Sequence, residues 1–86
     1  MSGAREVVEV LALALTGRAD QVHVAESRHH DTTLVELFVG PGDLGKVIGR
    51  QGRTAAALRT LAAAAGEREG KTVTLEIRDG RPPVRS

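Results

Sequence analysis

The sequence predicts an α+β fold in which three helices cover one face of a three-stranded mixed sheet, in the order α-β-β-α-α-β. Three observations predict this fold. Apolar residues recur at helical spacing in some segments, and alternate with polar residues in others, as they do in strands. A third is the length of 86 residues, which suits a single domain with a modest core.

The first element is a helix over residues 4–16. Val7, Leu11 and Leu15 recur at the spacing of one helical face. Gly17 follows directly, and glycine is a common helix stop. We therefore expect an amphipathic helix that ends at this glycine.

Two strands are expected next. Residues 21–26 alternate, with Val22 and Val24 on one side, and residues 33–39 alternate in the same way. The polar stretch between them, residues 27–32, is short enough for a hairpin loop. The two strands are therefore predicted to be antiparallel neighbours.

A helical pair and a third strand complete the fold. Pro41 suits the first turn of a short helix, which Gly49 ends. A long helix is predicted over residues 53–65, with Gly66 as its stop. Residues 71–77 alternate as a strand, and the helical crossover allows this strand to lie parallel to the preceding one.

Residues 1–79 are predicted to form this domain, and residues 80–86 a flexible basic tail. The end of the chain has no periodicity and contains two adjacent prolines, which is typical of a loose terminus.

Composition limits the function classes. Hydrophobic residues make up 41% and charged residues 27% of the chain, and no apolar run is long enough to span a membrane. There is no cysteine, so neither a disulfide nor a thiolate metal site is expected. The start of the chain does not resemble a signal peptide. We expect a cytoplasmic protein without a cofactor, a metal or a membrane partner.

Positive charge is concentrated in one part of the chain. Residues 40–66 carry four basic side chains against one acidic, whereas residues 1–39 carry three arginines against six acids. The basic side chains surround Gly49 and Gly52. A local basic patch on a nearly neutral protein favours a phosphate-bearing partner.

Two glycine patterns for nucleotide binding are incomplete here. Residues 40–45 match G-x-G-x-x-G, but Gly49 cuts short the helix that a dinucleotide fingerprint requires. Residues 40–46 match a P-loop until Val47 occupies the position of the Mg²⁺-ligating hydroxyl. Neither pattern is therefore our preferred interpretation.

A third pattern is G-x-x-G between two helices, at residues 49–52. Two glycines without Cβ atoms allow a sugar-phosphate chain to approach the main chain, and the following helix N-terminus attracts the same anion. Lys46, Arg50 and Arg53 add positive charge around it. Val47 and Ile48, with Leu58 across the gap, are expected to provide an apolar floor for unpaired bases.

The run VIGRQG, placed between two helices inside β-α-α-β, resembles the signature of the KH (K-homology) domain. The additional helix and strand in front resemble the type II arrangement of bacterial KH domains. The longer segment ELFVGPGDLGKVIGRQGRTAAALRTL is similar to the KhpA (YlqC-like) family of small bacterial proteins, over residues 4–79. One departure is Ala55, where KH domains commonly carry a larger aliphatic residue, so a shallower groove is expected.

The resemblance implies a single-stranded RNA-binding protein, in which the G-x-x-G loop clamps about four nucleotides. It further implies a cytoplasmic RNA chaperone or post-transcriptional regulator with a role in cell shape, division and cell-wall organisation. The implied protein partners are a second copy or a KhpB (Jag)-type KH protein. The RNA-binding residues are then expected to be Lys46, Val47, Ile48, Gly49, Arg50, Gln51, Gly52 and Arg53.

A rival interpretation is a protein-interaction module. Phe38, the single aromatic residue, shares a strand face with Leu34 and is expected on the open side of the sheet. It is either covered by the hairpin or tail, or forms a protein contact, because exposed apolar patches often mark such sites. His29 and His30 are adjacent in a loop and do not have the spacing of a zinc site. No catalytic constellation is visible, so an enzyme is not expected.

Overall fold

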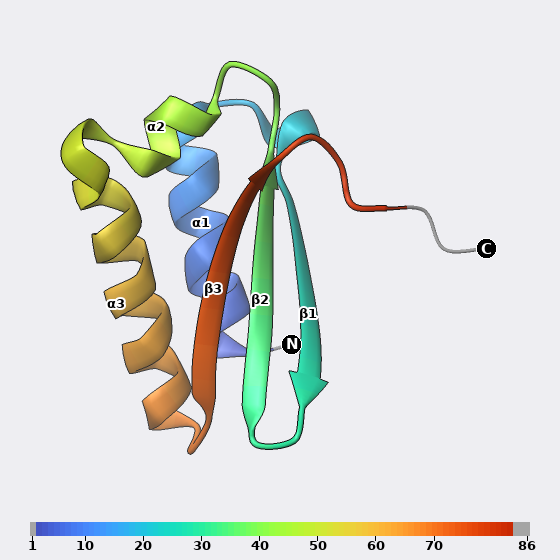
Figure 1. Ribbon diagram of the computed structural model, residues 1–86, viewed down its shortest axis with the longest axis vertical. Coiled ribbons are helices and arrows are strands. Elements are labelled where there is room, and N and C mark those ends of the chain that lie inside the picture. The colour runs from blue at the N-terminus through green and yellow to red at the C-terminus, as the bar shows by residue number, and fades with distance from the viewer. Residues whose placement is uncertain (1, 84–86) are drawn as a thin grey trace.

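A computed structural model of the chain describes residues 2–83, so residues 84–86 of the predicted tail lie outside the described residues. Figure 1 shows the fold, which has the predicted order of helices and strands. The elements are α1 (Gly3–Thr16), β1 (His23–His29), β2 (Thr32–Val39), α2 (Leu44–Ile48), α3 (Arg53–Arg68) and β3 (Thr72–Asp79), with short 3-10 turns at Ala19–Gln21 and Arg50–Gly52.

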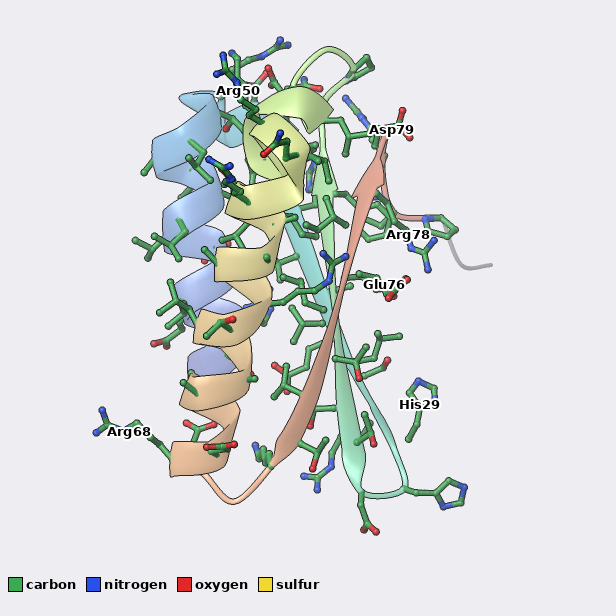
Figure 2. All side chains as sticks on the ribbon, turned by 60° about the vertical axis from the view of Figure 1, so that its left-hand side comes forward. His29, Arg50, Arg68, Glu76, Arg78 and Asp79 are labelled. Atoms are coloured by element: carbon green, nitrogen blue, oxygen red, sulfur yellow. The ribbon has the colours of Figure 1, made fainter. Side chains whose placement is uncertain are left out.

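The three strands form one mixed sheet in the order β1-β2-β3. β1 and β2 are antiparallel, with Val24 opposite Leu37, and β2 and β3 are parallel, with Val35 opposite Leu75. The helices lie together on one side of this sheet (Figure 2). The predicted α+β architecture of a mixed three-stranded sheet covered on one face is therefore confirmed.

The core lies between the central strand β2 and the helices. Val35, Leu37 and Val39 of β2 are completely buried, because alternation places all three on the face that the helices cover. Leu75 of β3 and Val47 of α2 complete this layer. Burying such side chains is the main source of stability for a chain of this size.

The face of α1 that packs on the sheet differs from the predicted one. Ala4, Val8 and Ala12 are completely buried, whereas Val7 and Leu11 are only partly buried. Small residues at the buried positions bring the helix close to the sheet and to α3. The larger apolar side chains consequently lie beside α3 and towards the outer surface.

Several element ends differ from the predicted ones. β1 continues to His29, so the hairpin turn consists of His30 and Asp31 alone. The predicted loop was too long because polar residues also continue a strand that is exposed on one side. Pro41 lies in the turn before α2 and not in its first turn.

Gly66 does not end α3 as predicted, because the helix continues to Arg68. A Cβ atom at Gly66 would collide with Cγ2 of Val73 and would lie 2.9 Å from the carbonyl oxygen of Lys71. The glycine therefore permits close packing of α3 against β3. The helix ends after it, where the Lys71 N–H donates to the Gly66 carbonyl at 2.8 Å.

Each outer strand receives an arginine from a helix. Arg5 of α1 donates from Nη2 to the carbonyl of Val24 in β1 at 3.2 Å. Arg59 of α3 donates from Nε to the carbonyl of Leu75 in β3 at 3.3 Å. These bonds connect the helical layer to both edges of the sheet.

Within residues 2–83, none of the helices is long and apolar enough to cross a membrane.

Candidate nucleic-acid interface

The connection between α2 and α3, residues 49–52 and hereafter the bend, has an unusual backbone. Gly49 (φ 75°, ψ 173°), Gln51 (φ 58°, ψ 24°) and Gly52 (φ 71°, ψ 14°) all have positive φ. The Gly49 N–H donates to the Gly45 carbonyl at 2.8 Å, and the Gly52 N–H donates to the Gly49 carbonyl at 3.2 Å. Residues with side chains rarely adopt such angles, so the bend requires glycine at its two ends.

Gly49 is required for a second reason. A Cβ atom there would collide with Oγ1 of Thr54 and would lie 2.7 Å from its Cβ. At Gly52 the space is open, and only the positive φ favours glycine. Gly49 therefore brings the main chain of the bend against the start of α3, and Gly52 sets the direction in which α3 leaves.

The bend is open to solvent. Arg50 and Gln51 are exposed, as are Lys46 before the bend and Arg53 after it. Figure 2 shows Arg50 at one end of the molecule, directed away from the body. Arg53 donates from Nη2 to Oε1 of Gln51 at 2.7 Å, and this hydrogen bond holds the two side chains together. Gly49 and Gly52 are half-buried.

The bend leads directly into the N-terminus of α3. This helix has 16 residues, and Gly52 at its N-cap has no side chain that could accept hydrogen bonds from the first free N–H groups. The N-terminus of a helix carries a partial positive charge and attracts anions. Arg50 and Arg53 form no salt bridge within the described residues, so their charge adds to that of the helix end.

The predicted apolar floor is only partly present. Val47 is completely buried and Leu58 is 2% exposed, so both side chains belong to the core, and their expected contact with bases stays a prediction. Ile48 is half-buried and reaches the surface. Ala55, the small residue at the groove position, is 3% exposed. The surface beside the bend therefore presents main chain and positive charge more than apolar side chains.

Two residues missed by the sequence analysis lie next to Lys46. The carboxylate of Asp43 lies 3.3 Å from Nζ of Lys46 and 3.5 Å from Nε of Arg18. Asp43 is 2% exposed. Arg18 belongs to the connection between α1 and β1, in the acid-rich part of the sequence, and no local pattern indicates its proximity to α2.

The other candidate residues lie elsewhere. Phe38 is 4% exposed and Leu34 is half-buried, which favours the covered arrangement of Phe38, and a protein contact there stays a prediction. His29 lies at the opposite end of the molecule from Arg50 (Figure 2). The hairpin is therefore too distant to contact a nucleotide bound at the bend. Residues 2–83 contain no group of three or more metal-ligating side chains.

Comparison with known families decides the relationship of this chain. A family model described as "KhpA/KhpB, KH domain" matches residues 5–77. The chain belongs to the KhpA/KhpB KH-domain family. The order of helices and strands agrees with the type II KH arrangement that the sequence predicts.

Curated relatives match over almost their whole length. The RNA-binding protein KhpA of Aquifex aeolicus is 48% identical over 77 residues, which cover 90% of this chain and 98% of the relative. The RNA-binding protein KhpA of Clostridium perfringens is 45% identical, over 85% of this chain and 97% of the relative.

Solved structures match in fold. A crystal structure of Aquifex aeolicus Era bound to GDP.AlF4⁻ superposes with a TM-score of 0.61 and 20% identity, over 90% of this chain and 30% of the Era chain. A crystal structure of Era in complex with MgGDPNP and nucleotides 1506–1542 of 16S ribosomal RNA superposes with a TM-score of 0.61 and 22% identity, over 88% of this chain and 29% of the Era chain. At this identity the similarity concerns the fold alone.

Proposed function

We propose that the chain binds single-stranded RNA through its sugar-phosphate backbone at the bend, and that it acts as a binding protein and not as an enzyme. The observation that carries this proposal is the bend with its three positive φ angles and its exposed centre at Arg50 and Gln51, next to the open N-terminus of α3. Its curated relatives are named RNA-binding proteins, which supports RNA as the ligand.

The residues of the bend take different roles. Gly49 and Gly52 allow the RNA backbone to approach the main chain closely. Arg50 and Gln51 face the phosphates, where an arginine can form two parallel hydrogen bonds to one phosphate group. Arg53 adds charge beside the N-terminus of α3.

Binding at this surface has limited sequence preference. Base edges and base stacking carry sequence information, whereas phosphate contacts do not. Val47 and Leu58 are buried, and the single aromatic residue, Phe38, is buried as well. Ile48 is then the apolar side chain left to contact a base beside the bend.

This mode of binding suits an RNA chaperone or post-transcriptional regulator, because such a protein must engage and release many sequences. The family resemblance further implies a role in cell shape, division and cell-wall organisation, with a KhpB (Jag)-type partner. We include these roles in the proposal.

Replacement of the exposed centre of the bend tests RNA binding. The double variant Arg50→Asp with Gln51→Asp should abolish binding of a fluorescently labelled, unstructured oligoribonucleotide, because it puts negative charge against phosphate. The wild-type complex should weaken with salt, with a log-log slope of about −2 for three contacts at roughly −0.7 each. Fluorescence anisotropy measures both quantities.

Arg68→Asp provides the matched control. Arg68 is also an exposed arginine, but it lies at the other end of α3 from Arg50 (Figure 2). Its variant should keep RNA affinity within about threefold, because exposed charges separated by more than about 10 Å are largely screened. Unchanged affinity of the double variant would refute RNA binding at the bend.

A second candidate function is association with another copy of the chain. Val10, Leu15 and Leu61 are 63%, 39% and 47% exposed, and a hollow of about 240 Å³ lies between Leu15 and Leu61. Val10 and this hollow share one outer face of α1 and α3. Two copies related by a twofold axis could therefore each insert Val10 into the other. This face is a better dimer surface than Leu34 and Phe38.

Sedimentation analysis tests this association. Val10→Glu should convert a dimer to a monomer, because it buries a charge in an apolar contact. Leu34→Glu, the same change on the opposite side of the sheet, should leave the dimer intact. A monomeric wild-type chain would refute self-association, and dissociation by Leu34→Glu alone would assign the contact to the sheet.

A further inference from the structure

Beyond the bend, one buried carboxylate interacts with two basic side chains from distant parts of the chain. The side chain of Asp43 is 3% exposed, while those of Arg18 and Lys46 are 48% and 53% exposed. Lys46 approaches Oδ1, and Arg18 approaches Oδ2. Oδ2 accepts no hydrogen bond within the described part of the chain. Its nearby charge partner is therefore the arginine.

The main chain around Arg18 is fixed on both sides. Its N–H donates to Oγ1 of Thr16 at 3.2 Å, and its carbonyl accepts from the Gln21 N–H at 2.9 Å. Thr16 is 6% exposed and donates to the Ala12 carbonyl at 2.9 Å. Arg18 therefore projects from an ordered turn and not from a loose loop.

The main chain of Asp43 is also fixed by hydrogen bonds on both sides. Its N–H donates to the Gly40 carbonyl, and its carbonyl accepts from the Lys46 N–H, both at 3.0 Å. Gly40 packs so closely on Gln21 that a Cβ atom there would lie 2.8 Å from Oε1 of Gln21. The connections after α1 and after β2 thus pack together at the end of the molecule where α2 lies (Figure 1).

The charges of this group do not cancel. Two cations share one carboxylate, so one positive charge remains, at the surface and next to the bend. A guanidinium has five N–H donors, and the contact to Asp43 is made by Nε of Arg18. The two terminal nitrogens remain able to donate to a phosphate, for which their geometry is well suited.

We propose that Arg18 and Lys46 form a second phosphate-binding pair that extends the RNA surface beyond the bend, and that Asp43 is the positioning residue that holds the pair in place. The inference rests on the proposed RNA binding at the bend and adds a residue from the connection after α1. The ligand is one or more phosphates of the same RNA strand, beyond the roughly four nucleotides that a KH loop holds.

A purely structural role of Asp43 makes different predictions. If the carboxylate only held the two connections together, substitution of Arg18 would lower the stability of the protein and leave its RNA affinity unchanged. If its charge only opposed phosphate, its neutralisation would tighten RNA binding. Positioning predicts the reverse, because Asp43→Asn removes the partner that holds both cations, although it also removes a negative charge.

The experiment compares Arg18→Gln, Asp43→Asn and the control Arg68→Gln, using labelled oligouridylates of four and eight nucleotides over a range of KCl concentrations. For the eight-nucleotide RNA, Arg18→Gln should weaken binding about fivefold and make the salt slope shallower by about 0.7, the value of one phosphate contact. For the four-nucleotide RNA it should have little effect. Asp43→Asn should weaken binding of the longer RNA, and Arg68→Gln should not.

The outcomes separate this inference from the proposed function. Equal behaviour of Arg18→Gln and Arg68→Gln, while the double variant at Arg50 and Gln51 loses binding, overturns the second site and leaves the first intact. Retained binding by that double variant overturns both. Tighter binding by Asp43→Asn overturns its positioning role. Circular dichroism checks that each variant folds. If Asp43→Asn does not fold, the second site is tested by Arg18→Gln alone, through its salt slope and its different effects on the four- and eight-nucleotide RNAs.

Discussion

The two long helices begin in opposite ways. The N-terminus of α1 is satisfied by the protein itself: Oγ of Ser2 accepts from the Arg5 N–H at 3.1 Å, and the carboxylate of Glu69 accepts from the Gly3 N–H at 3.1 and 3.2 Å. The N-terminus of α3 follows Gly52, which has no side chain. One helix start is therefore closed by an internal anion, and the other is open.

This difference shows how one physical property can serve stability or function. Both helix ends carry the same partial positive charge. At α1 an acidic residue from a distant part of the chain neutralises it and fastens the end of α3 to the start of α1. At α3 no side chain caps the helix start, so its charge is available for the proposed RNA ligand, and Arg50 and Arg53 increase it. A basic patch stays available to a ligand where the topology leaves it without internal partners.

The largest effect is expected from closing the space beside the open helix start. Gly49→Ala should lower the free energy of unfolding by about 3 kcal/mol, because it combines backbone strain at positive φ with a collision against Thr54. Gly70→Ala is the control, since Gly70 also has positive φ but open space around it. That variant should cost about 1 kcal/mol. Urea unfolding followed by circular dichroism measures both, and equal losses would contradict the packing argument.

A smaller effect is expected from opening the closed helix start. Ser2→Ala removes the N-cap of α1 and should lower the free energy of unfolding by about 1 kcal/mol. Ser2 also donates from Oγ to Oε1 of Glu26 at 2.6 Å, and this hydrogen bond is the main reason why the pKa of Glu26 is lower than its ordinary value.

The lowered pKa of Glu26 makes the effect of Ser2→Ala dependent on pH. A depressed carboxyl pKa contributes stability above the pKa of the unfolded chain, and this contribution is lost as pH falls through the folded-state pKa. The difference between wild type and variant should therefore shrink as pH falls below about 4. Ser27→Ala, on the same strand as Glu26, should show no such change. If the stability difference between wild type and Ser2→Ala did not depend on pH, the Ser2 hydrogen bond would be excluded as the cause of the lowered Glu26 pKa.

The smallest change in stability is expected from adding an acid to the open helix start. Ala56 is exposed in the first turn of α3, so Ala56→Glu should raise the free energy of unfolding by about 0.5 kcal/mol through its interaction with the helix dipole. It should at the same time weaken RNA binding. Ala64→Glu adds the same charge towards the other end of α3, and should neither stabilise the protein nor reduce RNA affinity. If both variants reduced affinity equally, net charge and not the open helix start would govern binding.

Local patterns were sufficient for the order of elements and for the bend. Alternation in residues 33–39 and the glycine and charge pattern in residues 46–53 are visible in short stretches of sequence. Gly66 could not be interpreted in this way. A glycine near a helix end usually marks a stop, but here it permits close approach of Val73, a contact that depends on how α3 packs against β3.

The composition of the site was harder to predict. Val47 and Ile48 are adjacent and apolar, and only the packing of α2 on the core determines that the first is buried and the second reaches the surface. Arg18 lies in a stretch of the sequence dominated by acids, and it reaches the carboxylate that also contacts Lys46 only because two connections meet at Asp43. Sequence patterns therefore indicated the bend and the charges around it, but not the approach of Arg18 to Asp43.

The arginines that reach the outer strands have a consequence for behaviour at high concentration. A small open sheet can pair with strands of neighbouring molecules and grow into fibres, because the carbonyl and amide groups at its edges have no hydrogen-bond partners within the sheet. Arg5 and Arg59 each occupy one such carbonyl and place a cation beside it. Neighbouring molecules in a concentrated solution are therefore less able to pair edge to edge.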